Sequence, residues 1–100
     1  MIAPAPGAQI RVRLYVADDA PNSVLARANL KAALALFPER AVDVEIIDVV
    51  ADPERGLRDA VLVTPMLVKV EPAPERRILG NLTDRATLLG ALGLEEPRHD

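Results

Sequence analysis

The sequence predicts a single α/β domain built on a mixed four-stranded sheet. Apolar residues alternate with polar ones from Ile10 to Ala17 and again within residues 42–50, a period of two that is typical of β-strands. Between these strands, apolar residues recur with the spacing of an amphipathic helix. A strand, a helix and a strand within about forty residues predict two parallel strands joined by a crossover. A later tight turn around residues 72–75 predicts an antiparallel hairpin.

Composition limits the classes of function. The chain has 100 residues, half of them hydrophobic, which is enough for one buried core. A net charge of −3 and only two aromatic residues argue against nucleic-acid binding. The absence of cysteine excludes disulfides, thiolate metal sites and thiol redox chemistry. The single histidine, His99, is next to last, so we expect no catalytic triad, no metal and no cofactor.

The absence of membrane-spanning and secretion signals predicts a cytoplasmic protein. No apolar run approaches the roughly 20 residues that span a bilayer, so no membrane association is expected. The N-terminus lacks the basic start and apolar stretch of a signal peptide. We expect a flexible arm over residues 1–9, a domain over 10–94 and a flexible tail over 95–100.

The first strand places its apolar side chains on one face: Ile10, Val12, Leu14 and Val16. Asp19 or Asn22 is expected to cap the helix that follows, which runs to about Leu36 and stops before Pro38. One helix face should pack on the sheet, with Ala26, Leu30, Ala33, Leu34 and Phe37. An opposite stripe is read either as ordinary helix-forming residues or as a partner surface: Leu25, Ala28, Ala32, Ala35 and Leu36.

The second half adds two strands and two helices. Residues 42–50 form the second strand, with one face made by Val42, Val44 and Ile46. Asp52-Pro53 begins a short helix, residues 63–70 form a third strand, and a short fourth strand covers 76–79. Thr83-Asp84 caps a final helix that carries Leu88, Leu89 and Leu92. This β-α-β-α-β-β-α order is the thioredoxin-like arrangement.

Three segments resemble the KaiB family: "LYVADDAPNS", "IDVVADP" and "VTPMLVKVEPAPERRILGNLTDR". They stand in the family's order and at its spacing, and the resemblance covers residues 10 to about 94. It implies a non-enzymatic regulatory protein that binds KaiC, a ring-shaped RecA-like ATPase and autokinase, and modulates its ATPase or phosphorylation cycle in circadian or stress timing. It also implies a metamorphic protein, in which a thioredoxin-like form binds KaiC. The alternative is the family's rearranged, self-associating fold, a dimer or tetramer.

This sequence departs from the family pattern at several positions. Asp18 and Asn81 replace the usual glycine and acidic residue, so Asp18 puts in doubt a turn that needs positive φ. In the last helix, Ala91 and Gly93 align where relatives often carry glycine and then aspartate. Ala91 should favour the helical, thioredoxin-like form, and Gly93 should end the helix.

Prolines mark another expected feature of the fold. Thr64-Pro65 stands at the entrance of the third strand, where thioredoxin-like proteins keep a cis-proline, so we expect a cis bond there. Pro65, Pro72 and Pro74 are also candidates for slow steps between the two forms of the family.

Partner-binding candidates lie mostly in the second half. Lys69, Arg76 and Arg77 are expected to form a basic patch on the hairpin, read either as a contact with an acidic partner or as protection of an edge strand by charge. Further candidates for partner contact are Asp84, Asn22 and Ser23. The acidic pairs Asp18-Asp19 and Asp48/Asp52 are read as caps or solvated residues rather than as metal ligands.

Two other classes of function remain open from the sequence. One is a cysteine-free thioredoxin-like enzyme or transferase that uses Ser23 or Tyr15 on a small thiol substrate. The other is a sensor module that acts in trans on a histidine kinase.

Overall fold

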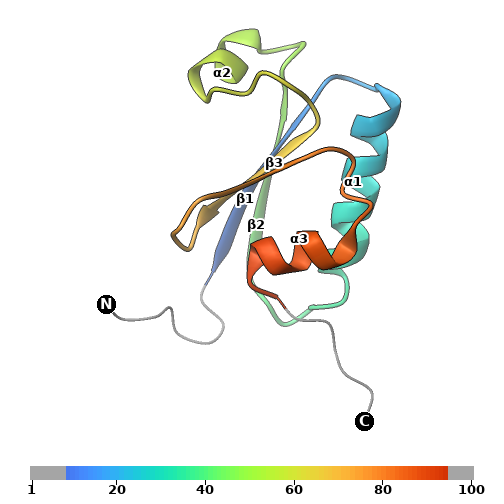
Figure 1. Cartoon of the computed structure of the whole chain (residues 1–100), viewed down its shortest axis with the longest axis vertical. Helices are drawn as coiled ribbons and strands as arrows, with labels where there is room; N and C mark the ends of the chain where they lie inside the picture. The colour runs from blue at the N-terminus through green and yellow to red at the C-terminus, as the bar shows by residue number, and fades with distance from the viewer. Residues whose placement is uncertain (1–8, 95–100) are drawn as a thin grey trace.

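The computed structural model describes residues 9–94 and confirms the predicted order of elements. They are β1 (Ile10–Val16), α1 (Pro21–Leu34), β2 (Val42–Asp48), α2 (Pro53–Arg58), β3 (Met66–Glu71), β4 (Arg76–Leu79) and α3 (Arg85–Leu92) (Figure 1). The sheet order is β2-β1-β3-β4, with β1 and β2 parallel and the other pairs antiparallel. Apart from residue 9, the predicted arm and tail lie outside the described residues, as does His99.

The main core lies on the sheet face that α1 and α3 cover (Figure 1). Val12 and Leu14 of β1 and Leu67 of β3 are at most 2% exposed. The helices contribute the residues predicted from their periodicity: Ala26, Leu30 and Ala33 of α1, and Leu88, Leu89 and Leu92 of α3. Leu34 and Phe37 pack against this core only partly buried, because they lie at and beyond the end of α1.

A second, smaller core lies on the opposite face of the sheet. Its members are Tyr15, Ile47, Val61, Met66 and Val68, with Val49 and Val70 packed against them. α2 and the residues after it return over one end of this face, which is why Tyr15 is only 1% exposed. Alternation alone placed Tyr15 among the charged residues of β1, on the face away from the main core.

The start and end of α1 differ from the expectation. Ala20 occupies the N-cap position without a side-chain hydrogen bond, so neither Asp19 nor Asn22 caps the helix. Pro21 at the first helical position supplies a preset φ and removes one of the N–H groups that would otherwise lack a partner there. The helix ends at Leu34, and the chain then tightens into a turn in which Phe37 N–H donates to the Leu34 carbonyl at 3.0 Å.

β2 is shorter than expected and is largely exposed. It stops at Asp48, whose Oδ1 accepts the Val50 N–H at 2.9 Å. Val44 and Ile46, two of the residues on the predicted strand face, are 36% and 42% exposed. The reason is the sheet order, which puts β2 at an edge that α1 covers incompletely.

The turn between β1 and α1 explains one departure from the family pattern. Asp18 has a φ of 51°, so this position does need the left-handed conformation, which glycine adopts most readily. Aspartate is among the few residues that adopt this conformation readily. Its N–H donates to Oδ1 of Asp48 at 3.1 Å, which ties this turn to the end of β2.

The structure confirms the helix caps predicted in the second half of the chain. Asp52 accepts the Arg55 N–H at the start of α2, and Asp84 accepts the Thr87 N–H at the start of α3. Gly93 ends α3 in the left-handed conformation, as expected. The Thr64-Pro65 bond is cis, as predicted, and the bonds before Pro72 and Pro74 are also cis.

Candidate functional site

The three basic candidates on the hairpin do not form one patch. Lys69 and Arg76 are paired across β3 and β4, on the face that α1 and α3 cover. Arg77 pairs with Val68, a member of the second core, and therefore points to the opposite face. The prediction of a single patch was wrong because adjacent strand residues alternate between faces.

Lys69 is a buried lysine rather than a surface one. It is 7% exposed, and burial together with the nearby Arg76 lowers its pKa. No carboxylate among residues 9–94 forms an ion pair with it. Arg76 remains exposed at the edge of the sheet.

The polar candidates near the start of α1 and α3 take part in structural contacts. Asn22 Oδ1 accepts a hydrogen bond from Asn81 Nδ2 at 3.3 Å, and Asp84 caps α3. Ser23 is 1% exposed, and its Oγ accepts the Ala17 N–H at 3.0 Å. Its side chain is therefore enclosed in the fold, whereas Asn22 and Asp84 stay exposed.

The residues of the enzyme alternative are inaccessible. Ser23 and Tyr15 are each 1% exposed, and both are engaged in hydrogen bonds within the chain. Within the described residues, no group of three or more acidic or histidine side chains is arranged to hold a metal ion. Of the acidic side chains singled out in the sequence, Asp48 and Asp52 accept backbone N–H groups.

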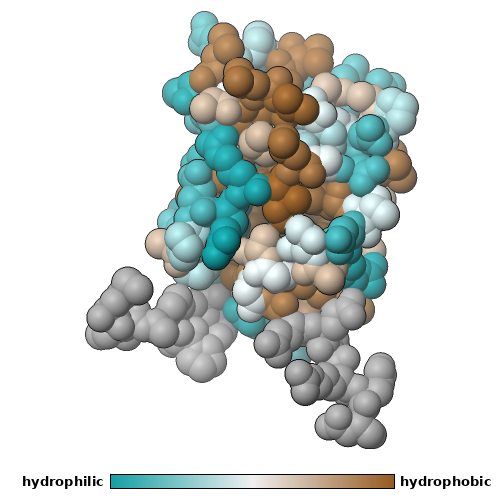
Figure 2. Space-filling model, in the orientation of Figure 1, coloured by the Kyte–Doolittle hydropathy of each residue, from teal (hydrophilic) through white to brown (hydrophobic). Residues whose placement is uncertain are grey.

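Exposed apolar residues gather at the end of the molecule that carries α2. We call this set the apolar end: Val50, Leu57, Leu62, Val63 and Leu79. Leu62 is 84% exposed and Leu57 is 73% exposed. Figure 2 shows hydrophobic colour concentrated over this end of the molecule. Leu79 lies close to the loop that carries Leu62 and Val63, because the next residue, Gly80, donates its N–H to the carbonyl of Pro65 at 2.9 Å, just after that loop.

Sequence reasoning missed the apolar end. The signal was the run "AVLV" at residues 60–63, which reads equally well as the entrance of a buried strand. In the structure β3 begins only at Met66, so Leu62 and Val63 stand in the preceding loop. Contiguous exposed apolar residues of this kind mark interaction sites more often than isolated ones do.

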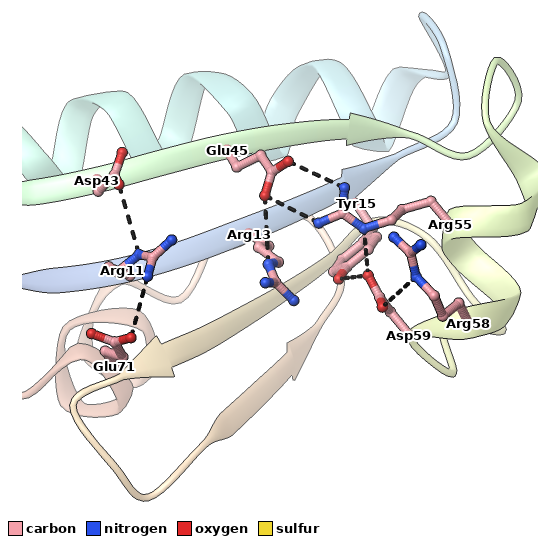
Figure 3. A network of polar contacts seen from close by, with 9 residues as sticks. All are labelled: Arg11, Arg13, Tyr15, Asp43, Glu45, Arg55, Arg58, Asp59 and Glu71. Carbon is pink, nitrogen blue, oxygen red and sulfur yellow. Dashed lines mark hydrogen bonds and ion pairs between the residues drawn. The ribbon is translucent and has the colours of Figure 1, made fainter.

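Figure 3 shows a network of polar contacts between α2 and the neighbouring strands. The Tyr15 hydroxyl donates to Asp59 Oδ2 at 2.6 Å, and Arg55 Nε donates to the same oxygen at 2.8 Å. The guanidinium of Arg55 also binds both carboxylate oxygens of Glu45 on β2, at 3.1 and 3.2 Å. These contacts join α2 to the first two strands.

The ionisation of the network follows from its geometry. The Tyr15 hydrogen bond, with further help from Arg55, lowers the pKa of Asp59. Burial, followed by the bond to Asp59, raises the pKa of Tyr15. Arg55 lowers the pKa of Glu45, and both carboxylates raise that of Arg55. At neutral pH the network therefore holds ionised carboxylates and a neutral phenol.

Arg77 adds a contact from β4. Its guanidinium donates to the backbone carbonyls of Asp59 at 2.9 Å and Ala60 at 3.2 Å. Ala60 has a φ of 58°, the left-handed conformation that reverses the chain after α2. The β4 side chain thus holds the turn that leads into Leu62 and Val63.

Comparison with known proteins identifies the family of this fold. Residues 13–94 match the KaiB domain. The chain belongs to the KaiB family. It is 42% identical to the circadian clock oscillator protein KaiB of Synechococcus elongatus, over 83% of this chain and 81% of that protein. It is 41% identical to the KaiB of Microcystis aeruginosa, over 83% and 80% of the two chains.

Solved structures show that this KaiB-family chain has a thioredoxin-like fold. The N-terminal domain of Synechococcus elongatus SasA superposes with a TM-score of 0.70 at 27% identity, over 99% of this chain and 98% of that one. Chloroplastic thioredoxin z gives a TM-score of 0.72 at 20% identity, over 85% and 76%. Yeast mitochondrial thioredoxin 3 gives 0.68 at 16% identity, over 84% and 76%.

Among residues 9–94, no helix is both long enough and apolar enough to cross a bilayer.

Proposed function

We propose that this chain is a non-enzymatic clock regulator that binds a KaiC-type ATPase and modulates its ATPase or phosphorylation cycle, in circadian or stress timing. Membership of the KaiB family, whose matched relatives are named as circadian clock oscillator proteins, supports the clock role. The cytoplasmic location stays a prediction.

The apolar end is the observation that carries the binding proposal. Leu57, Leu62 and Val63 are each more than half exposed, although burying apolar side chains of this size would stabilise the fold. Such a surface costs hydration free energy in the free protein, and this cost is recovered when a partner covers it. We propose that the ATPase presents an apolar surface to these residues.

Positive charge borders this surface. The side chains of Arg58 and Arg77 are 71% and 36% exposed, and Arg77 lies on the same sheet face as Leu79. Charges at the rim of an interface steer association and fix its orientation more than they add affinity. An acidic rim on the ATPase would therefore suit this end of the molecule.

The other predicted contact residues enter the proposal according to their exposure. Arg76, Asn22 and Asp84 are exposed and stay candidates for direct contact. Lys69 would have to be uncovered before a partner reached it, since it is 7% exposed. Ser23 supports the start of α1 from inside, so we assign it no contact.

We propose that binding selects the thioredoxin-like form described here. A partner that binds one of two forms draws the population toward that form. Ala91 in the last turn of α3 and the left-handed Gly93 after the helix both support the helical state of the last segment. Self-association as a dimer or tetramer would then belong to the rearranged form.

Size-exclusion chromatography with the host's KaiC homologue tests the function, with ATP, with ADP and without nucleotide. We expect a stable complex that Leu62→Asp and Leu79→Asp abolish. Val24→Asp is the control, because Val24 is an apolar residue of α1 that is 50% exposed and belongs neither to the apolar end nor to the stripe of α1 considered as a partner surface. Absence of a complex in every nucleotide state would overturn the proposal.

A second candidate is the sensor role, in which the chain acts in trans on a histidine kinase. The match to the N-terminal domain of SasA over nearly the whole chain supports it, because it shows the same fold serving as one domain of another protein. Co-elution with a purified histidine kinase of the host, and not with the ATPase, would favour this candidate.

A further inference from the structure

We infer that a polar latch positions the apolar end: Tyr15, Glu45, Arg55, Asp59 and Arg77 hold α2 and the following turn in one arrangement, and so prepare Leu57, Leu62 and Val63 for a partner. The identity of that partner rests on the proposed function. The positioning itself does not, because it concerns contacts within this chain.

The first argument is that α2 has little apolar anchoring of its own. Gly56 is the buried residue of this six-residue helix, and Leu57 is 73% exposed. Gly56 allows a close approach, since an added Cβ would lie 3.1 Å from Cγ1 of Val49. Val61, which is 8% exposed, is the next apolar anchor along the chain. A helix this short is not stable by itself, so its placement depends on contacts with the rest of the fold.

Asp59 supplies the central contact of the latch. Its side chain is 16% exposed, and its carboxylate accepts a hydrogen bond from the hydroxyl of Tyr15, whose ring is buried in the second core. The same carboxylate accepts a hydrogen bond from Arg55 Nε, and this bond orients the guanidinium toward Glu45 on β2. Hydrogen bonds between charged groups are the stronger kind, and planar two-point contacts add directional specificity. The end of α2 is therefore tied to β1 and β2 in a defined orientation.

Arg77 completes the latch from the other edge of the sheet. It binds the carbonyls of Asp59 and Ala60, just before the exposed Leu62 and Val63. The chain therefore leaves the turn in a direction set from β4 as well as from β1. A surface loop held in this way loses less conformational freedom when a partner binds, which favours affinity.

The alternative is that these contacts contribute only to overall stability. The two interpretations differ in which amides should exchange faster when a contact of the latch is removed. A positioning role predicts local opening confined to α2 and its turn, whereas a stability role predicts that all protected amides exchange faster together.

Native-state hydrogen exchange of Tyr15→Phe and Asp59→Asn tests the inference. The reporter amides are Asp59, Ala60 and Val61, which donate to carbonyls of α2 at 2.8 to 3.1 Å. The reference is the Leu88 amide of α3, bonded to the Asp84 carbonyl at 3.1 Å. We expect exchange of the reporters to rise about tenfold, equivalent to about 1.4 kcal/mol, with the reference unchanged.

Arg11→Gln is the matched control. Arg11 also forms ion pairs across the open sheet face, with Asp43 at 3.7 Å and Glu71 at 3.3 Å, but these do not touch α2 or its turn. Its reporter amides should exchange as in the unmodified chain. Equal acceleration of the reporters and the reference in the latch variants, or no acceleration, would overturn the inference.

Binding to the ATPase gives the second readout. We expect Tyr15→Phe to weaken the complex several-fold although every residue of the apolar end is retained, mainly through faster dissociation. Loosened reporter amides with unchanged affinity would show that the latch does not prepare the surface. If the unmodified chain does not bind the ATPase, the proposed function fails, and hydrogen exchange alone still decides whether the latch holds the turn.

Discussion

Tyr15 and Asp59 are joined by a hydrogen bond of 2.6 Å between residues 44 positions apart in the chain. This bond connects the inner strand β1 to the residue that follows α2, and the Tyr15 side chain is buried. The bond from Tyr15 lowers the pKa of Asp59, whereas burial and then the bond to Asp59 raise the pKa of Tyr15.

The phenol of Tyr15 should titrate above its ordinary pKa of about 10. Burial and then the Asp59 contact oppose its ionisation. The chain has one tyrosine and no tryptophan, so ultraviolet difference absorbance reports this residue alone. Asp59→Asn should move the midpoint toward 10, because it removes the negative charge. A wild-type midpoint at or below 10 would contradict the buried contact.

The free energy of unfolding should fall in acid. The pKa values of Asp59 and Glu45 are lower in the folded chain than in the unfolded one. Their stabilising contribution is therefore present above the unfolded values of about 4 and is lost as pH falls through the folded values. Urea denaturation between pH 6 and pH 2.5 measures this loss. Unchanged midpoints across that range would refute it.

On the alkaline side the sign is reversed. Because the folded pKa of Tyr15 is raised, its contribution is complete below the unfolded value of about 10 and is lost as pH rises through the folded value. Urea midpoints from pH 8 to 11 should decline near the upper end for the unmodified chain. Tyr15→Phe has no phenol to ionise and should decline less.

Two neighbouring positions in α3 should respond in opposite directions. Gly90 has open space where a Cβ would stand, so Gly90→Ala should raise the free energy of unfolding by about 1 kcal/mol. Ala91→Gly should lower it by a similar amount, about 1 kcal/mol. Thermal unfolding of both variants measures the difference. A loss of stability in Gly90→Ala would indicate that α3 is not the main state of this segment.

The left-handed turn at Asp18 should discriminate between side chains. Asp18→Gly should change the free energy of unfolding by less than about 1 kcal/mol, because glycine adopts this φ freely but gains entropy in the unfolded chain. Asp18→Val should cost about 1–2 kcal/mol, since a branched side chain is strained there. Equal stability of the valine and glycine variants would argue against the left-handed turn.

Substitution by alanine should affect stability differently at a buried and at an exposed leucine. Leu14→Ala should destabilise the chain by about 2–5 kcal/mol, because Leu14 is fully buried in the main core. Leu62→Ala should change stability by less than about 0.5 kcal/mol, because Leu62 is 84% exposed. Denaturant unfolding of the two variants compares the same chemical change at both sites. A large cost for Leu62→Ala would mean that the apolar end belongs to the core.

Local patterns were sufficient for the elements and their order. Alternation in β1, helical spacing in α1, the aspartate caps of α2 and α3, and the glycine after α3 each depend on neighbours within a few residues. The capping of α1 was wrong for a related reason. The helix begins with Pro21, whose φ is already helical, and the side chain of Asn22 bonds to Asn81 of a distant segment, which no local pattern indicates.

By itself, the sequence determined the α/β architecture, the cis-proline position and the resemblance to the KaiB family. The tertiary structure decided which apolar residues are covered, because coverage depends on sheet order and on where distant segments return. It buried Tyr15 under the α2 turn, left Ile46 at an edge and exposed Leu62 in a loop. It also separated Arg77 from Lys69, since pleating sends adjacent side chains to opposite faces.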